Sequence, residues 1–169
     1  MIYILTGDIR TGKTTALLNW VNTSAMRSGT GRKDVDGLLC PDGENGKRYF
    51  LKIKSQKEIE LEVALESEKV ISVGPFYFLE SAFETANNYL IETAREKDFQ
   101  YMIIDELGKL ELKNKGLHDA AKTSIAQFMF NENKHLILVV RESLFEDIIN
   151  HYTISEYSVL GIEDLENLK

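Results

Sequence analysis

The first fifteen residues constrain the fold of this chain more than any other stretch. Residues 1–6 form a short apolar run rich in β-branched side chains, which predicts a buried strand. The segment GDIRTG follows, and KTT then opens a helical pattern, so the spacing is GxxxxGK[ST]. Strand, glycine-bounded loop and helix in this order are typical of a Walker A phosphate-binding loop. We therefore expect residues 7–15 to bind the phosphates of a nucleotide: Gly7, Asp8, Ile9, Arg10, Thr11, Gly12, Lys13, Thr14 and Thr15.

These residue types suit a polyphosphate for separate physical reasons. Gly7 and Gly12 lack a Cβ, so backbone N–H groups can approach the phosphates closely. The helix N-terminus adds unpaired N–H donors and a partial positive charge. Lys13 can reach the β and γ phosphates, and the hydroxyl of Thr14 can ligate Mg²⁺. A chance match in an ordinary strand-to-helix turn is the alternative, and the position between a strand and a helix argues against it.

Composition limits the classes of protein to which the chain can belong. Its 169 residues, 43% apolar and 28% charged, suit a single folded domain over residues 1–169. The net charge of −7 argues against general nucleic-acid binding, although a local phosphate site remains compatible with it. Cys40 is the one cysteine, which rules out a disulfide within the chain and a thiolate zinc site. The chain opens on a strand rather than a leader and has no membrane-length apolar run, so we expect a cytoplasmic protein with no membrane contact. Its oligomeric state is left open.

Strands and helices alternate along the sequence, which predicts an α/β fold with a doubly wound, mostly parallel sheet. The predicted strands cover residues 1–6, 35–40, 70–73, 101–105, 135–140 and 157–160, and the predicted helices cover residues 13–27, 81–97, 117–128 and 144–151. Residues 48–65 differ, because apolar and polar side chains alternate there. Folding this segment about Gln56 places Ile53 opposite Ile59, Leu51 opposite Leu61, Tyr49 opposite Val63 and Lys52 opposite Glu60, which predicts an inserted antiparallel hairpin. We favour a role in covering the sheet edge over a role as a recognition surface.

A second motif follows the apolar run of residues 101–104. Asp105 stands at the carboxyl end of a predicted buried strand, where a Walker B aspartate holds Mg²⁺ beside the loop threonine. Glu106 follows directly and can take a proton from an attacking water, which favours hydrolysis over transfer to an acceptor. A solvated carboxylate at a strand end is the alternative for Glu106. We expect Thr14 and Asp105 to hold Mg²⁺, and Lys13 and Glu106 to be catalytic.

Charge develops at the γ-phosphate during the reaction, so a further cation is expected there. Lys109 and Arg141 are the candidates, and we favour Arg141 because it follows a strand at the sheet edge where α/β folds bind ligands. A glutamate directly after the aspartate is associated with phosphate-loop folds in which one strand separates the loop strand from the aspartate strand. We therefore predict the order 5-1-4-3-2 for the parallel strands, with residues 135–140 between residues 1–6 and 101–105.

The octet DELGKLEL, residues 105–112, resembles the DEIGKMEL-type segment of a small nucleoside-triphosphatase family, known as cancer-related NTPase and from thermophilic prokaryotes. GLL at residues 37–39, RYFLKI at 48–53, GPFY at 74–77 and VVR at 139–141 extend the resemblance over most of the chain. It implies Mg²⁺-dependent hydrolysis of nucleoside triphosphates to diphosphates, with loose base preference. It also implies phosphate binding by residues 7–15 and metal and water roles for Asp105 and Glu106.

The loop departs from the family pattern GxPGxGKTT at two positions, with Ile9 in place of proline and Arg10 in place of glycine. The fourth loop position tends toward positive φ, which strains a residue that is not glycine by about 1 kcal/mol. Arg10 either points outward and is tolerated or arches over the phosphates as a cation, and we favour the first. Arg10→Gly is then expected to leave turnover within a few-fold of wild type.

Hydrolysis of ATP, GTP or related triphosphates is the function that these motifs favour. A small nucleotide or metabolite kinase is one alternative, although the chain has no cluster of arginines for a lid over the phosphates. A GTP-dependent switch is another, but Asn114-Lys115-Gly116-Leu117 lacks the aspartate of an Asn-Lys-x-Asp base reader.

Overall fold

The computed structural model describes residues 1–8, 11–27, 35–64, 69–96 and 98–168. Seven strands form the main sheet in the order β10-β1-β9-β8-β2-β3-β4. Their bounds are β1 (Ile2–Gly7), β2 (Val35–Leu39), β3 (Tyr49–Lys52), β4 (Glu58–Glu60), β8 (Tyr101–Leu107), β9 (His135–Arg141) and β10 (Ser158–Leu160). Strands β10, β1, β9, β8 and β2 pair in parallel, whereas β3 and β4 add an antiparallel edge. The parallel strands therefore have the predicted order 5-1-4-3-2.

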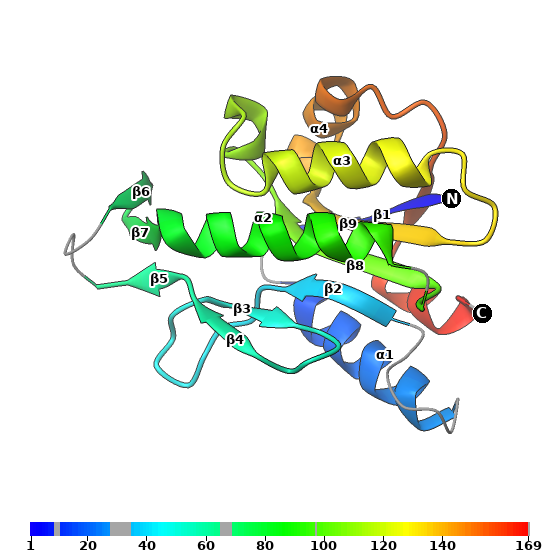
Figure 1. Cartoon of the computed structure of the whole chain (residues 1–169), viewed down its shortest axis with the longest axis horizontal. Coiled ribbons are helices and arrows are strands. Elements are labelled where there is room, and N and C mark those ends of the chain that lie inside the picture. The colour runs from blue at the N-terminus through cyan, green and yellow to red at the C-terminus, as the bar shows by residue number, and fades with distance from the viewer. Residues whose placement is uncertain (9–10, 28–34, 65–68, 97, 169) are drawn as a thin grey trace.

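Strand β9 lies between the loop strand β1 and the aspartate strand β8, as predicted (Figure 1). Its last residue, Arg141, pairs in register with Gly7, the last residue of β1. Because the three strands are parallel, their carboxyl ends meet at one edge of the sheet. The topology thus brings the start of the phosphate loop, Asp105 and Arg141 together.

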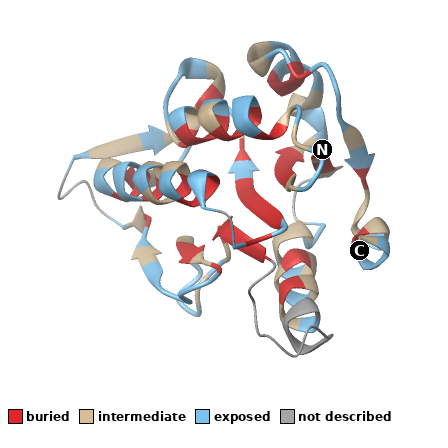
Figure 2. Ribbon diagram, turned by 45° about the vertical axis from the view of Figure 1, so that its right-hand side comes forward, coloured by how far each residue is buried: buried red, intermediate tan, exposed pale blue. Residues whose placement is uncertain are grey.

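Helices cover both faces of the sheet (Figure 1). One face carries α2 (Glu80–Arg95), α3 (His118–Phe128) and α4 (Phe145–Tyr152), and the other carries α1 (Lys13–Arg27) and the short 3₁₀ helix η4 (Ile162–Asn167). Ile4 packs in the α2–α3–α4 core and its neighbour Leu5 in the α1 core. Burial on both faces explains the unbroken apolar runs of β8 and β9, whose central residues are buried (Figure 2). Among the described helices, none is long and apolar enough to cross a membrane.

The hairpin register predicted for residues 48–65 is wrong. Strand β3 pairs with β4 so that Phe50 lies opposite Ile59 and Tyr49 lies opposite Glu60. The turn comes earlier than predicted, because Lys52 exchanges backbone hydrogen bonds with Gln56 and Lys57. The predicted pairs of Ile53 with Ile59, Leu51 with Leu61, Tyr49 with Val63 and Lys52 with Glu60 do not form.

The reason for this error is that β3 is buried on both faces. Phe50 packs in the α2 core and Leu51 in the α1 core, so the alternation of apolar residues does not select one face. Ile53 leaves the hairpin altogether, and its N–H donates to the carbonyl of Gly37 in β2, at 3.0 Å. Strand β3 extends the sheet beyond β2, which fits the interpretation that this segment covers the sheet edge.

A second, three-stranded antiparallel sheet lies beside β4, in the order β5-β7-β6 (Figure 1). Its strands are β5 (Glu62–Val63), β6 (Val70–Val73) and β7 (Phe76–Leu79). Residues 70–73 were predicted as a strand and residues 62–63 as part of the hairpin, whereas residues 76–79 were not predicted as a strand. Strand β7 leads directly into α2, which fixes the small sheet against the main body of the fold.

Candidate active site

The phosphate loop joins β1 to α1, and its lysine is held close to the loop backbone. Lys13 Nζ donates to the carbonyl oxygens of Gly7 at 2.8 Å and Asp8 at 2.7 Å. Burial lowers the pKa of Lys13, which Asp105 partly opposes. The first helical hydrogen bond runs from Ala16 to Gly12, so the N–H groups before it are available to an anion. Ile9 and Arg10 lie outside the described residues, and the two alternatives for Arg10 stay untested.

Asp105 lies at the carboxyl end of β8 and bridges the loop helix to β2. Its side chain is 1% exposed, and Oδ2 accepts hydrogen bonds from Thr14 Oγ1 at 2.8 Å and from the Cys40 N–H at 3.0 Å. Burial raises the pKa of Asp105 to about 6, although both hydrogen bonds oppose the rise. A nearby cation would favour the charged carboxylate.

The donor set around Asp105 fits a hard divalent cation. Asp105 Oδ1 is buried and has no hydrogen-bond partner among the described residues, while Thr14 offers a hydroxyl oxygen beside it. Mg²⁺ prefers a few oxygen ligands of this kind together with water and substrate phosphates. Thr14 and Asp105 are therefore the residues that would hold Mg²⁺.

The backbone at Glu106 is irregular, and its carboxylate is far more exposed than that of Asp105. Its φ of 64° lies in the left-handed region, and the pairing of β8 with β9 is irregular between Ile104 and Leu107. Such a bulge re-aims a side chain at a strand end, and the positive φ is a strained conformation for glutamate. The Glu106 side chain consequently remains 37% exposed next to a fully buried aspartate.

Two arginines approach the Glu106 carboxylate, one at each oxygen. Arg141 Nη2 lies 3.9 Å from Oε1, and Arg48 Nη1 lies 3.7 Å from Oε2. Burial, with the Glu106 and Asp105 carboxylates nearby, raises the pKa of the Cys40 thiol, which stays protonated beside these carboxylates. Arg141 therefore lies beside Gly7 at the start of the phosphate loop and beside the candidate base, and its expected place at the γ-phosphate stays a prediction.

Lys109, the other predicted cation, is exposed in the turn after β8. That turn is organised by Glu111 in η2 (Glu111–Lys113), whose carboxylate accepts from the N–H groups of Gly108 at 2.7 Å and Leu117 at 2.8 Å. Glu111 is 3% exposed, and burial raises its pKa. Within the octet DELGKLEL, Glu111 thus has a structural role through its described contacts, and Lys109 lies at the surface.

Sequence reasoning missed Arg48 and Cys40 as site residues. Arg48 begins the RYFLKI segment and Cys40 follows GLL, and both segments were recognised only as part of the family resemblance. Arg48 lies beside Glu106 because the second sheet packs against its side chain. The periodicity of the sequence did not predict this sheet. The available signal was that these segments and DELGKLEL recur together, which indicates a shared location.

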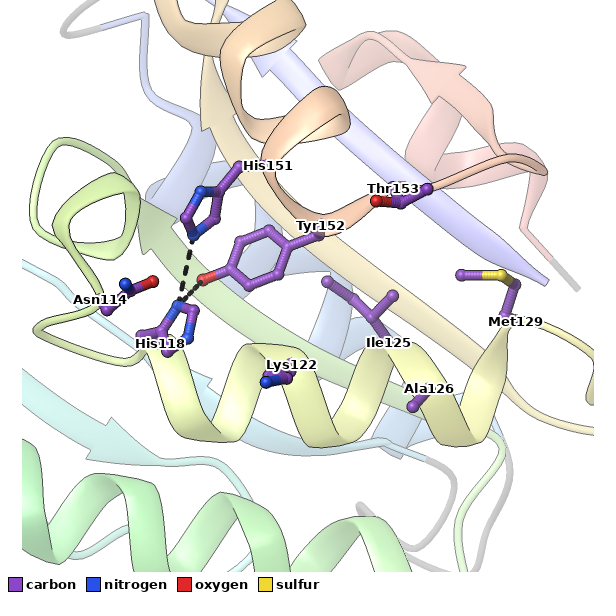
Figure 3. Close-up of a pocket in the computed structure, with 9 residues that line it drawn as sticks. All are labelled: Asn114, His118, Lys122, Ile125, Ala126, Met129, His151, Tyr152 and Thr153. Carbon is purple, nitrogen blue, oxygen red and sulfur yellow. Dashed lines mark hydrogen bonds between the residues drawn. The ribbon is translucent and has the colours of Figure 1, made fainter.

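A separate hollow of about 430 Å³ lies between α3 and α4, away from these residues (Figure 3). His118 Nδ1 lies 3.1 Å from the Tyr152 hydroxyl and 3.5 Å from His151 Nε2 at its mouth. Its lining shares no residue with the phosphate loop or with the end of β8.

The strand order, the phosphate loop on α1 and the Asp105–Glu106 pair at the end of β8 define a P-loop nucleoside-triphosphatase fold. The sequence profile of the family described as NTPase matches residues 2–164, so the chain belongs to this NTPase family and is a nucleoside-triphosphate hydrolase.

Two solved structures share the fold. A human cancer-related nucleoside triphosphatase is 20% identical, with a TM-score of 0.68 over 98% of this chain and 93% of its own. THEP1 from the hyperthermophile Aquifex aeolicus is also 20% identical, with a TM-score of 0.68 over 99% of this chain and 96% of its own. A comparison with curated protein sequences finds no match.

Proposed function

We propose that the chain hydrolyses nucleoside triphosphates to diphosphate and phosphate in an Mg²⁺-dependent reaction, with loose base preference. The observation that carries the proposal is the hydrogen bond between Thr14 and Asp105, directly beside the exposed carboxylate of Glu106. It joins the residues suited to a metal with the residue suited to activate water. The strand between β1 and β8 supports hydrolysis over transfer, since that strand order accompanies a catalytic glutamate.

Each residue of the site has a separate role in the proposed reaction. Lys13 exchanges the carbonyls of Gly7 and Asp8 for the β and γ phosphates, and the N–H groups at the start of α1 hold the same phosphates. Glu106 accepts a proton from the water that attacks the γ-phosphorus, and Arg141 stabilises the charge that develops on the γ-phosphate. Bound Mg²⁺ would neutralise charge on the β and γ phosphates.

Loose base preference is proposed because the site residues above suit phosphate, metal or water rather than a base. ATP, GTP, CTP and UTP are then all substrates, with kcat/KM values within about one order of magnitude of one another. General nucleic-acid binding is not expected, given the net charge of −7.

Phosphate release in the absence of any acceptor tests the proposal. The assay measures the four ribonucleoside triphosphates with Mg²⁺ and with excess chelator, and a Lys13→Ala variant serves as the control for contaminating activity. We expect release from all four that requires Mg²⁺ and is lost in the variant. Diphosphate formation that requires an added small-molecule acceptor and yields no free phosphate would favour a kinase, and release from GTP alone would favour a switch.

A further inference from the structure

Arg48 is the residue whose position is least explained by the reaction as described above. It lies in the segment that joins β2 to β3, far along the chain from the phosphate loop and from Asp105. Its side chain is only 16% exposed, and its guanidinium lies 3.7 Å from Glu106 Oε2. A half-buried arginine beside a candidate catalytic carboxylate either forms a structural ion pair or holds the carboxylate in the position that the reaction needs.

The surroundings of Arg48 fix its guanidinium from three sides. Nε donates to Glu62 Oε2 at 2.9 Å, and Glu62 is itself 12% exposed. The guanidinium carbon lies 4.5 Å from the ring centroid of Phe76 and 4.6 Å from that of Phe78. A guanidinium that packs against two aromatic rings and donates a hydrogen bond to a carboxylate has little freedom to move. The small sheet β5-β7-β6, which contains Glu62, Phe76 and Phe78, thus holds this cation in place.

The carboxylate of Glu106, by contrast, needs contacts with other side chains to hold it in one orientation. Its side chain is 37% exposed and leaves a strained bulge at the end of β8, so the backbone alone does not select one carboxylate position. Arg48 and Arg141 approach different oxygens of this carboxylate: Arg141 ends the neighbouring strand β9, and Arg48 lies in the segment between β2 and β3. Arg141 is 42% exposed, so Arg48 is the more firmly placed of the two cations.

From this arrangement we propose that Arg48 is a positioning residue that holds the carboxylate of Glu106 in the orientation needed to accept a proton from the attacking water. The inference rests on the proposed role of Glu106 as general base. Its physical basis is that a general base must lie within hydrogen-bond reach of the proton it abstracts, and small misplacements lower rates steeply. The second sheet then serves catalysis indirectly, through the arginine it holds.

The test compares Arg48→Met and Arg48→Lys with wild type. Methionine keeps an apolar side chain against the two rings but removes the charge, whereas lysine keeps a cation without the fork that reaches both carboxylates. We expect kcat for phosphate release to fall by tenfold or more in Arg48→Met and by threefold or more in Arg48→Lys. Affinity for a non-hydrolysable triphosphate analogue should stay within about threefold of wild type. Lys57→Met, which removes an exposed charge from the turn between β3 and β4, is the control and should match wild type.

A double-variant cycle separates positioning from mere structural support. In a Glu106→Gln background, Arg48→Met should lower kcat by less than about twofold, because the group it positions is already disabled. A full additional tenfold loss in that background would overturn the proposal, as would a kcat equal to or above wild type in either single variant. If Arg48→Met does not fold, Arg48→Lys alone decides by the same criterion. Full turnover by Glu106→Gln would instead refute the role of Glu106 as general base, and no phosphate release by wild type would refute the proposed function, so these failures are distinguishable.

Discussion

Thr14 and Asp105, which are 91 residues apart in the sequence, are joined by a hydrogen bond of 2.8 Å. The bond links the first turn of α1 to the carboxyl end of β8. It therefore joins the phosphate-binding motif, residues 7–15, to the motif Asp105–Glu106, to which we assign metal binding and the activation of water. The predictions below start from this bond and move outward from it.

Thr14→Val keeps the shape of the side chain but removes the hydroxyl. Asp105 keeps its bond to the Cys40 N–H in the variant, so the fold should survive. We expect the Mg²⁺ concentration for half-maximal phosphate release to rise by about tenfold, because one of the oxygen ligands is lost. A magnesium titration of activity measures this. Thr23→Val, an exposed substitution on the same helix, is the control and should leave the titration unchanged; an unchanged titration for Thr14→Val would remove Thr14 from the metal site.

Gly116→Ala should destabilise the turn that follows the active-site strand. Gly116 has a φ of 65°, and an added Cβ would lie 2.2 Å from Oε1 of the buried Glu111. Backbone strain and the displaced carboxylate together should lower the free energy of unfolding by at least about 2 kcal/mol. Gly46→Ala is the matched control, since its φ is 73° but nothing lies within 4 Å of the added atom. Urea denaturation measures the free energy of unfolding of both variants. Equal losses of stability in the two would show that the contact with Glu111 contributes nothing.

His118 should make stability depend on pH. Burial, with the neighbouring His151, lowers the pKa of His118, while Asp119 and Glu111 oppose and Lys122 adds to the effect. The folded pKa is below the unfolded value, so the unfolded chain binds the proton first and acid favours unfolding. The stability that neutral His118 contributes is present above pH 6.5 and is lost as pH falls through that value toward the folded pKa.

The measurement is the difference in Tm between wild type and His118→Gln at several pH values from 8 to 5.5. Glutamine does not titrate. The other titratable groups are the same in both proteins, so their effects on Tm cancel in the difference. We expect the advantage of wild type to shrink as the pH falls. A difference that is constant across this range would show that the contact of His118 with Tyr152 is insensitive to its protonation.

The elements that could be predicted from the sequence are those encoded by local patterns. The phosphate loop, the Asp105–Glu106 pair and the buried runs of β8 and β9 each lie within a few consecutive residues, and the order of the parallel strands followed from the second motif. These features also predicted Arg141 at the end of β9, because a strand end is a local property, and its catalytic role stays a prediction.

The parts that were missed depend on contacts between distant segments. The register of β3 and β4 could not be predicted because Phe50 and Leu51 are buried on opposite faces, which removes the alternation that sets a register. Strand β7 was not predicted, and without it Phe76 and Phe78 had no place near Arg48. The contact of Arg48 with Glu106 is therefore a product of tertiary structure.

The central claim is that Glu106 activates the attacking water. The direct measurement is a comparison of wild type and Glu106→Gln in which affinity for Mg²⁺-nucleotide and the rate of phosphate release are determined on the same preparations. Glutamine keeps the size of the side chain but cannot accept the proton, so we expect nucleotide affinity to stay within about threefold and kcat to fall by about a hundredfold or more. Turnover equal to wild type would contradict the account, and would leave Glu106 as a carboxylate at the end of a strand.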